Sequence, residues 1–250
     1  MLGDQRFVEY LTQSGYHPRS SKHGDEMSRL LAQDLMAICP IIKNLAEDGS
    51  MVFELDRPPD PDVPLGWNID LVLGPPKKIS MGFLSGAGGI AYGPTSKIQI
   101  AVDAKCIMTE HGKARRNRQR DLNSLATILH RESPATVVGG LVAINMAPQF
   151  RSPLRNGEIT VHKNIERIVA ETVSLFEDLL TAHSNSQGAS ARIDAVGVIV
   201  VEYSNIPGEQ ARLVNTPPAP QAESPVYYQT FVKRLCEQFV RNREMKLVEV

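Results

Sequence analysis

The chain has few cysteines and few aromatic residues. Only three cysteines occur among its 250 residues, Cys39, Cys106 and Cys236, and aromatic residues make up 6% of the sequence. The cysteines are widely separated and lack paired spacing, so the sequence predicts neither a disulfide framework nor a zinc site.

Long hydrophobic runs are also missing. The longest, such as residues 195–201, are far too short to span a bilayer, and residues 1–6 lack a basic region followed by an apolar one. We therefore expect a cytoplasmic protein without a membrane partner. With 42% hydrophobic residues and a net charge of −1, the chain can bury a full core.

Two segments have the alternating, β-branched pattern of half-buried strands, residues 67–73 and 97–102. The first contains Asp70, and the second leads directly into Asp103, Ala104 and Lys105. Because side chains alternate along a strand, Asp103 and Lys105 share a face and Ala104 points the other way. One acid from each strand and the lysine are thus predicted to project toward one site.

These residue types suit metal-assisted hydrolysis of a phosphodiester. Mg²⁺ prefers hard oxygen ligands and is usually held by one or two carboxylates, which makes Asp70 and Asp103 candidate ligands of Mg²⁺, or of Mn²⁺ in its place. Lys105 would orient or deprotonate the attacking water and contact the scissile phosphate. The candidate catalytic residues are therefore Asp70, Asp103 and Lys105, with Cys106 packed beside them as a small apolar group.

A second triplet of the same kind, Glu244, Met245 and Lys246, serves as an internal comparison. It ends a charged helical stretch, residues 231–243, and has no strand before it and no paired acid upstream, so we interpret it as coincidence. The alternative interpretation of Asp103 and Lys105 is a solvent-exposed strand end with a surface ion pair.

The stretch after the first triplet, residues 111–120, carries five lysines or arginines and no acid. It continues into apolar residues spaced for one helix face, which are Leu122, Leu125, Ala126 and Leu129. Extended backward, that face passes through Gln119, Arg118, Arg115 and His111, whereas Lys113, Arg116 and Arg120 fall on the opposite, solvated side. The candidate DNA-binding residues of this run are Lys113, Arg115, Arg118 and Gln119. The alternative for such a run is a plain solvated helix.

The order of elements completes the pattern. An amphipathic helix over residues 26–46 precedes the Asp70 strand, with Leu30, Leu31, Leu35 and Ile38 on one face, and two apolar strands, residues 136–145 and 195–203, follow the basic helix. Over residues 20–147 the chain resembles the PD-(D/E)xK nuclease superfamily, the fold of most type II restriction endonucleases. The resemblance implies an α/β fold with a mixed central sheet flanked by helices.

The resemblance also implies a function, a Mg²⁺-dependent DNA endonuclease that acts on double-stranded DNA as a homodimer. Many relatives have a metal-binding glutamate on the helix before the first catalytic strand, and Glu26 is the position we choose for it, with Glu54 as the substitute. The alternative role of Glu26 is an ordinary acid in a first helical turn.

The chain departs from the family in three ways. Ile69 stands where the family name has proline, and the interval of 33 residues between Asp70 and Asp103 must hold an extra hairpin or loop. No tyrosine lies four residues after Gln119, which argues against the end-processing exonuclease branch.

Prolines divide the rest of the chain. We expect a core over residues 1–204, a proline-rich arm or linker over residues 205–225, and a C-terminal helix over residues 226–250 that packs on the core or on a dimer partner.

A glycine-rich run, residues 86–91, matches a variant of the dinucleotide fingerprint. That fingerprint needs a helix to begin at the glycines, but Gly93 and Pro94 follow almost at once, so we expect no nucleotide cofactor and interpret residues 82–94 as a loop between strands.

Two further functions stay open at this stage. One is a nuclease effector of antiviral defence that cuts without strict sequence, and the other is an inactive nucleic-acid-binding module of the same fold. A binding module would hold DNA equally well in EDTA and would cut no strand.

Overall fold

The computed structural model describes residues 1–61, 63–77, 84–85, 89, 91–181 and 192–248. The elements follow in the order α1 (Gly3–Ser14), α2 (Lys22–Ile38), α3 (Pro40–Glu47), β1 (Val52–Arg57), β2 (Ile69–Gly74), β3 (Leu84–Ser85), β4 (Ala91–Tyr92), β5 (Ile100–Ile107), α4 (His111–Glu132), β6 (Val137–Asn145), β7 (Gln149–Arg151), the 3₁₀ turn η2 (Pro153–Arg155), β8 (Ile159–Val161), α5 (Ile165–Thr181), β9 (Ala195–Glu202), β10 (Arg212–Leu213) and α6 (Tyr228–Val248).

Most strands belong to one mixed sheet with the order β10-β9-β6-β5-β2-β1-β4-β3. Strands β5, β6 and β9 are parallel, whereas β2 pairs antiparallel with both β5 and β1. Strands β7 and β8 form a separate two-stranded ribbon after β6. The predicted α/β fold with a mixed central sheet is confirmed.

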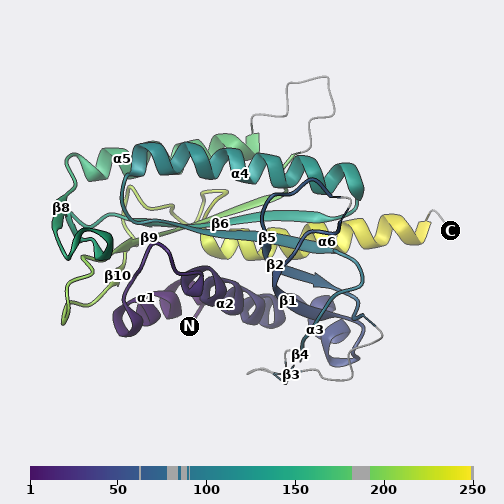
Figure 1. Cartoon of the computed structure of the whole chain (residues 1–250). Coiled ribbons are helices and arrows are strands. Elements are labelled where there is room, and N and C mark those ends of the chain that lie inside the picture. Colours follow the sequence, from purple (N-terminus) through teal and green to yellow (C-terminus); the bar gives the residue numbers. More distant parts are fainter. Residues whose placement is uncertain (62, 78–83, 86–88, 90, 182–191, 249–250) are drawn as a thin grey trace.

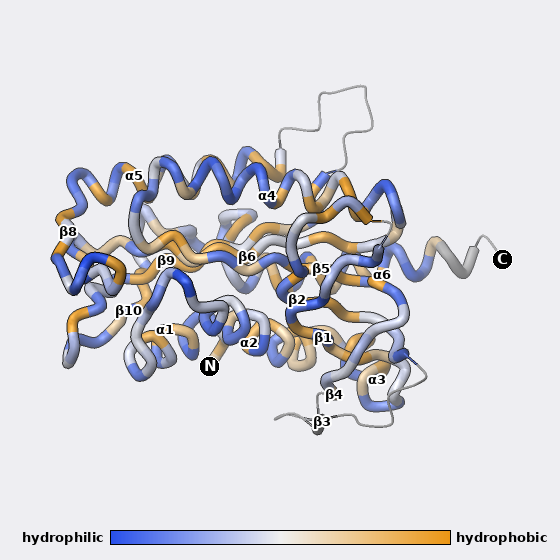
Figure 2. Tube along the Cα trace, in the orientation of Figure 1, coloured by the Kyte–Doolittle hydropathy of each residue, from blue (hydrophilic) through white to orange (hydrophobic). Residues whose placement is uncertain are grey.

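Helices cover both faces of this sheet. In Figure 1, α4 and α5 lie on one side, and α1, α2 and α6 lie on the other. Each side has its own apolar core, built from Leu122, Leu125 and Phe176 on the α4–α5 side and from Leu31, Leu35 and Phe231 on the other. Figure 2 shows apolar residues concentrated in the central strands, between the two helical layers.

The two apolar strands predicted for residues 136–145 and 195–203 are β6 and β9. They are almost entirely buried because helices cover both faces, and such strands need continuous apolar runs rather than alternation. Two glycines let the helices approach closely. A Cβ at Gly140 would lie 2.5 Å from Leu122 of α4, and one at Gly197 would lie 2.6 Å from Phe231 of α6.

The single helix predicted for residues 26–46 is wrong in its extent. The structure has two helices there, because α2 ends at Ile38 and α3 begins at Pro40. Proline cannot donate the hydrogen bond that would continue a helix, but its fixed φ suits the first position of a new one. The predicted apolar face is otherwise confirmed, with Leu30, Leu31 and Leu35 buried.

The strand predicted for residues 97–102 lies further along the chain. Strand β5 runs from Ile100 to Ile107 and therefore contains the Asp103–Lys105 triplet. Parallel pairing with β6 continues through this region, with Asp103 opposite Gly140 and Lys105 opposite Val142. Backbone hydrogen bonds between β5 and β6 thus continue β5 beyond residues 97–102, the alternating segment from which the strand was predicted.

The long interval between Asp70 and Asp103 contains the expected hairpin, formed by β3 and β4. Because β3 and β4 fall within residues 82–94, the interpretation of that whole segment as a loop is wrong. Residues 82–83, and residues 86–88 and 90 of the glycine-rich run, lie outside the described residues.

The proline-rich arm packs back on the core. Strand β10 pairs with β9, and the backbone N–H of Ala211 donates to the Thr12 hydroxyl at 3.0 Å. Helix α6 then packs beside α2 with Phe231, Val232 and Leu235 buried. The C-terminal helix therefore has its apolar partner within the chain.

Cys39 and Cys236 form a disulfide, so the prediction of no disulfide framework is wrong. The two residues are 197 positions apart, and they meet because α6 packs against the junction of α2 and α3. Spacing along the sequence carries no signal for such a long-range contact.

Among the described residues, no helix is both long enough and apolar enough to cross a membrane.

Candidate active site

Asp70, Asp103 and Lys105 come together as the sequence predicted. The ammonium nitrogen of Lys105 lies 2.7 Å from Asp70 Oδ2 and 2.7 Å from Asp103 Oδ1. The lysine therefore bridges two carboxylates that come from different strands.

The geometry follows from strand pairing. Leu71 of β2 pairs with Val102 of β5, so the next residues, Asp70 and Asp103, stand at the point where this antiparallel ladder ends. There the backbone N–H of Ala104 donates to Asp70 Oδ2 at 2.7 Å instead of to a strand neighbour. Asp103 and Lys105 share a face by alternation, and Ala104, which points the other way as predicted, packs into the core that contains residues of α2.

The three side chains differ in exposure. Asp103 is 1% exposed, whereas Asp70 is 19% and Lys105 is 23% exposed. Burial raises the pKa of Asp103 to about 7, because the stabilising charge of Lys105 does not offset the loss of solvation and the charge of Asp70 acts in the same direction as burial. Burial lowers the pKa of Lys105, but the charges of Asp103 and Asp70 outweigh it and the net direction is upward. Lys105 is thus an ammonium ion at neutral pH.

Asp103 satisfies few of its hydrogen bonds. Both of its carboxylate oxygens are buried, and beyond the ion-pair contact with Lys105 neither accepts a well-formed hydrogen bond from the part of the chain that the structure describes. A buried carboxylate normally has such partners. The carboxylate oxygens of Asp103 lie beside the carboxylate of Asp70, which is partly exposed. Because carboxylate oxygens are ligands that Mg²⁺ prefers, Asp70 and Asp103 fit a divalent cation.

A third acid is not part of this group. The described residues contain no set of three His, Cys, Asp or Glu side chains that could hold a metal ion, so the structure does not bring Glu26 together with the two aspartates. Glu26 acts instead on Tyr10, whose pKa is raised by burial and then by the charge of Glu26. Glu54 is also occupied, because it accepts hydrogen bonds from the backbone N–H and the hydroxyl of Thr95.

The first turn of α2 does approach the site, through residues next to Glu26. A Cβ at Gly24 would lie 3.3 Å from the Ala104 carbonyl oxygen and 3.9 Å from Asp70 Oδ1. Burial raises the pKa of Asp25, and the charge of Asp70 is among the lesser causes. Successive helical residues are rotated by about 100°, and the sequence does not reveal which one faces the sheet.

Cys106 packs as a small apolar group beside the site, as expected. Its sulfur lies 3.7 Å from the Met27 sulfur, and burial raises its pKa to about 12 against the charges of Lys105 and Arg118.

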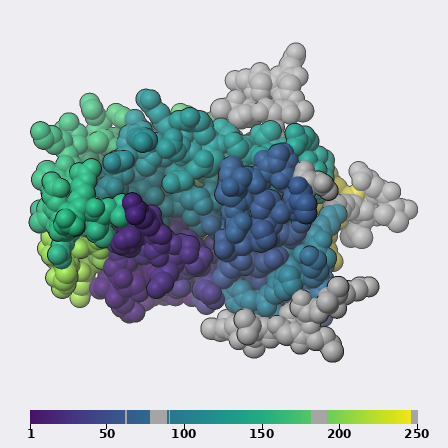
Figure 3. All heavy atoms as spheres, in the orientation of Figure 1, coloured from purple at the N-terminus to yellow at the C-terminus, as the bar shows by residue number. Residues whose placement is uncertain are grey.

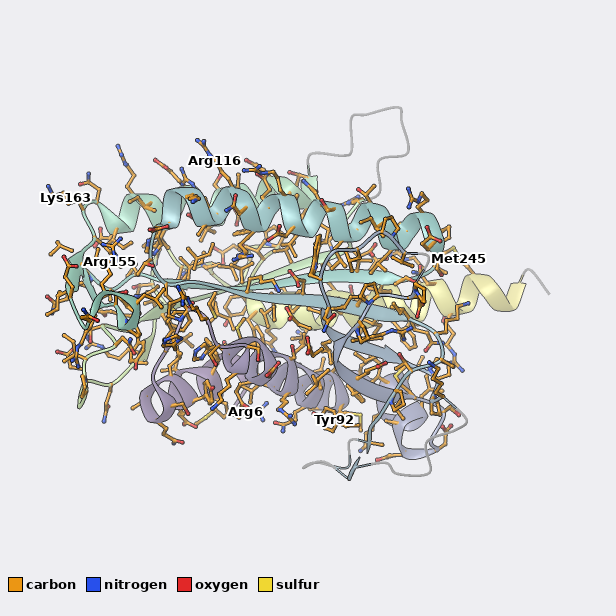
Figure 4. The ribbon with its side chains drawn as sticks, viewed as in Figure 1. Arg6, Tyr92, Arg116, Arg155, Lys163 and Met245 are labelled. Atoms are coloured by element: carbon orange, nitrogen blue, oxygen red, sulfur yellow. A yellow bond between two sulfur atoms is a disulfide. The ribbon has the colours of Figure 1, made fainter. Side chains whose placement is uncertain are left out.

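The basic start of α4 divides as the helical spacing predicted. Lys113, Arg116 and Arg120 are exposed, and Figure 4 shows Arg116 pointing away from the sheet. Arg118 and Gln119 are half-buried on the inner side.

Two of the DNA-binding candidates already have acidic partners. Arg115 pairs with Glu171 of α5 at 2.9 Å, and Arg118 pairs with Asp121 one turn later at 2.8 Å. The Nε atom of Arg118 is buried without a hydrogen-bond partner in the described residues, and its charge reaches Cys106. Within the described residues, the ion-pair partner of Arg118 is Asp121.

Figure 3 shows one face of the molecule, on which the blue segment leading into β2 lies at the surface with the purple N-terminal helices next to it.

No protein-family model matches the chain, and neither does a curated protein or a solved structure.

Proposed function

We propose that this protein is a Mg²⁺-dependent DNA endonuclease with a restriction-endonuclease-like fold. The observation that supports the proposal most is the placement of the Lys105 ammonium 2.7 Å from both Asp70 and Asp103, on two adjacent strands of a mixed sheet. Two acids and a lysine in this arrangement are what the PD-(D/E)xK resemblance requires.

Asp70 and Asp103 would hold the metal ion. When bound, Mg²⁺ lowers the pKa of a coordinated water and neutralises charge that develops on the phosphate. Among the described residues, the carboxylate oxygens of Asp103 lack well-formed hydrogen bonds, and a bound cation would neutralise their negative charge. Without a metal ion, the Lys105 ammonium supplies part of that positive charge.

Lys105 is protonated, so its role in the proposed reaction is electrostatic. Because its pKa is raised, its ammonium would contact the scissile phosphate and orient the attacking water rather than remove a proton from it. The backbone N–H of Ala104 holds Asp70 in position by donating to its Oδ2 atom.

The basic start of α4 would contact the DNA backbone. Arg118 and Gln119 are half-buried, with Arg115 one turn before them and Lys113 exposed near the helix start. A type II restriction enzyme acting on double-stranded DNA as a homodimer is the class we favour, since two-fold symmetry would match a palindromic site. A non-specific effector of antiviral defence would use the same chemistry.

One observation favours an inactive binding module instead. The described residues bring only two acids together, and Lys105 already pairs with both. Such a triad could stabilise the sheet without binding metal, and the protein would then bind DNA in EDTA as well as in Mg²⁺.

The test is cleavage of supercoiled plasmid and mixed-sequence phage DNA in Mg²⁺, in Mn²⁺ and in EDTA. We expect metal-dependent scission that is lost in Asp103→Asn and retained in Glu244→Gln, which alters the exposed acid of the second triplet on α6. Discrete bands would indicate sequence-specific cleavage, and a smear would indicate the non-specific effector. Equal scission by wild-type protein and Asp103→Asn would contradict the proposal.

A further inference from the structure

A second polar cavity lies away from the candidate active site, between α6 and the start of β9. It has a volume of about 600 Å³ and is lined by Arg192, Asp194, Thr230, Lys233, Arg234, Glu237, Gln238 and Arg241. Four cations and two acids give this cavity a net charge of +2. That volume is in the range of small-ligand sites.

The cavity is built by one stripe of α6. Its lining residues on this helix recur every three or four positions, the spacing of a single helix face. Phe231, Leu235 and Phe239 lie on the other side and are buried against the sheet. The charged stretch that the sequence showed at residues 231–243 thus has one apolar face that is packed and one polar face that borders an open cavity.

The cations of this cavity lack close partners. Arg192, Lys233, Arg234 and Arg241 make no ion pair or hydrogen bond with any residue that the structure describes, whereas arginines elsewhere, such as Arg57, do pair with acids.

One of the two acids of this cavity is already engaged. Asp194 Oδ2 accepts hydrogen bonds from the backbone N–H of Val138 at 2.7 Å and from His130 at 3.0 Å. Burial and then the charge of Arg192 lower the pKa of Arg234, and the smaller opposing effects of the Asp194 and Glu237 charges do not offset them, so Arg192 and Arg234 repel one another. An anion bound among them would relieve that repulsion.

We propose that this cavity binds the phosphate groups of a small ligand of nucleotide size. Guanidinium groups donate two parallel hydrogen bonds to a phosphate, and Lys233 adds a point charge. Thr230 and Gln238 offer further hydrogen-bonding groups. The cavity is separate from the candidate active site, because Asp194 precedes β9 and contacts the start of β6, whereas Asp103 and Lys105 lie in the middle of the parallel strand β5 and do not line the cavity.

Isothermal titration with pyrophosphate and with ADP tests this proposal. The full-length protein is titrated in EDTA, so that no divalent metal links the ligand to the aspartates. We expect saturable binding, weakened at least about tenfold in Arg234→Gln plus Arg241→Gln, a loss of roughly 1.4 kcal/mol. The matched control is Arg116→Gln plus Arg120→Gln, which removes two exposed arginines from α4 and should bind like wild-type protein.

Thermal unfolding without ligand shows whether each variant is folded, and Lys233→Gln, an exposed position, replaces the double variant if it is not. No saturable binding of either probe to wild-type protein, or equal weakening in the control, would overturn the proposal. A short DNA duplex provides the last comparison. If the cavity variant loses DNA affinity and wild-type protein binds neither probe, the cavity belongs to a nucleic-acid surface and the proposal is wrong.

Discussion

At the scale of single residues, Asp103 has an environment that is unfavourable for a charged carboxylate. Its carboxylate is buried in the sheet, its oxygens lack well-formed hydrogen bonds among the described residues, and burial raises its pKa to about 7. Such groups persist where function requires them, and removing them commonly stabilises a protein at the expense of activity.

We therefore predict that Asp103→Asn stabilises the protein while abolishing cleavage. The amide has nearly the shape of the carboxyl group but no charge to desolvate, so the free energy of unfolding at neutral pH should rise by about 1–2 kcal/mol. Urea denaturation of the metal-free protein measures this. Destabilisation by a similar amount would show that the ion pair with Lys105 is structural.

His111, the first residue of α4, is a second buried titratable group. Its ring Nε2 bonds the Asn145 carbonyl oxygen at 2.7 Å, and burial, aided by the charges of His162 and Arg115, lowers its pKa to about 4. The imidazole ring of His111 is therefore neutral in the folded protein at neutral pH.

This shift predicts a loss of stability in acid. The pKa of His111 in the folded state is below its unfolded value of about 6.5. The contribution of neutral His111 to the free energy of unfolding is therefore complete above pH 6.5 and is lost as the pH falls from there toward 4. His111→Gln, which does not titrate, should flatten the dependence of the unfolding free energy on pH between these limits. The matched control is His17→Gln at an exposed position, and an unchanged profile in His111→Gln would refute the assignment.

At the scale of elements, β5 and α4 position the proposed chemistry. Gly140 of β6 stands opposite Asp103 and lets Leu122 of α4 approach the sheet, which places the basic end of the helix near the site. Arg115 and Arg118 form ion pairs with Glu171 and Asp121 in the free protein. DNA phosphates would therefore have to compete with these two acids.

We predict that Arg115→Gln plus Arg118→Gln weakens DNA binding and makes it less dependent on salt. Each lost phosphate contact should reduce the slope of log affinity against log salt by about one. Fluorescence anisotropy in EDTA over a series of salt concentrations measures this, with Arg116→Gln plus Arg120→Gln as the control of equal charge. If both variants have the same slope, the inner face of α4 does not contact the backbone.

The elements also show what a sequence can and cannot predict. Alternation and helical spacing predicted the faces of β5 and α4, since both depend on local geometry. The break in the helix over residues 26–46 was encoded locally too, by Pro40. The rotation of α2 against the sheet depends on tertiary packing, so the helical pattern that points to Glu26 does not reveal that Gly24 approaches Asp70.

At the scale of the whole molecule, the α/β class followed from the order of helices and strands, whereas long-range contacts did not. The Cys39–Cys236 disulfide and the pairing of β10 with β9 join parts of the chain that no local pattern connects. The charged stripe of α6 was visible in the sequence, but only the fold shows that it faces a cavity beside Arg192.

The most direct test of the proposed active site is Mn²⁺ binding to the free protein, followed by electron paramagnetic resonance of the unbound ion. This measurement needs neither the correct DNA sequence nor an activator. We predict that wild-type protein and Glu244→Gln bind Mn²⁺ at a single site, and that Asp103→Asn and Asp70→Asn lose it. Binding by Asp103→Asn equal to that of wild-type protein, or no binding by wild-type protein, would contradict a metal site built from Asp70 and Asp103.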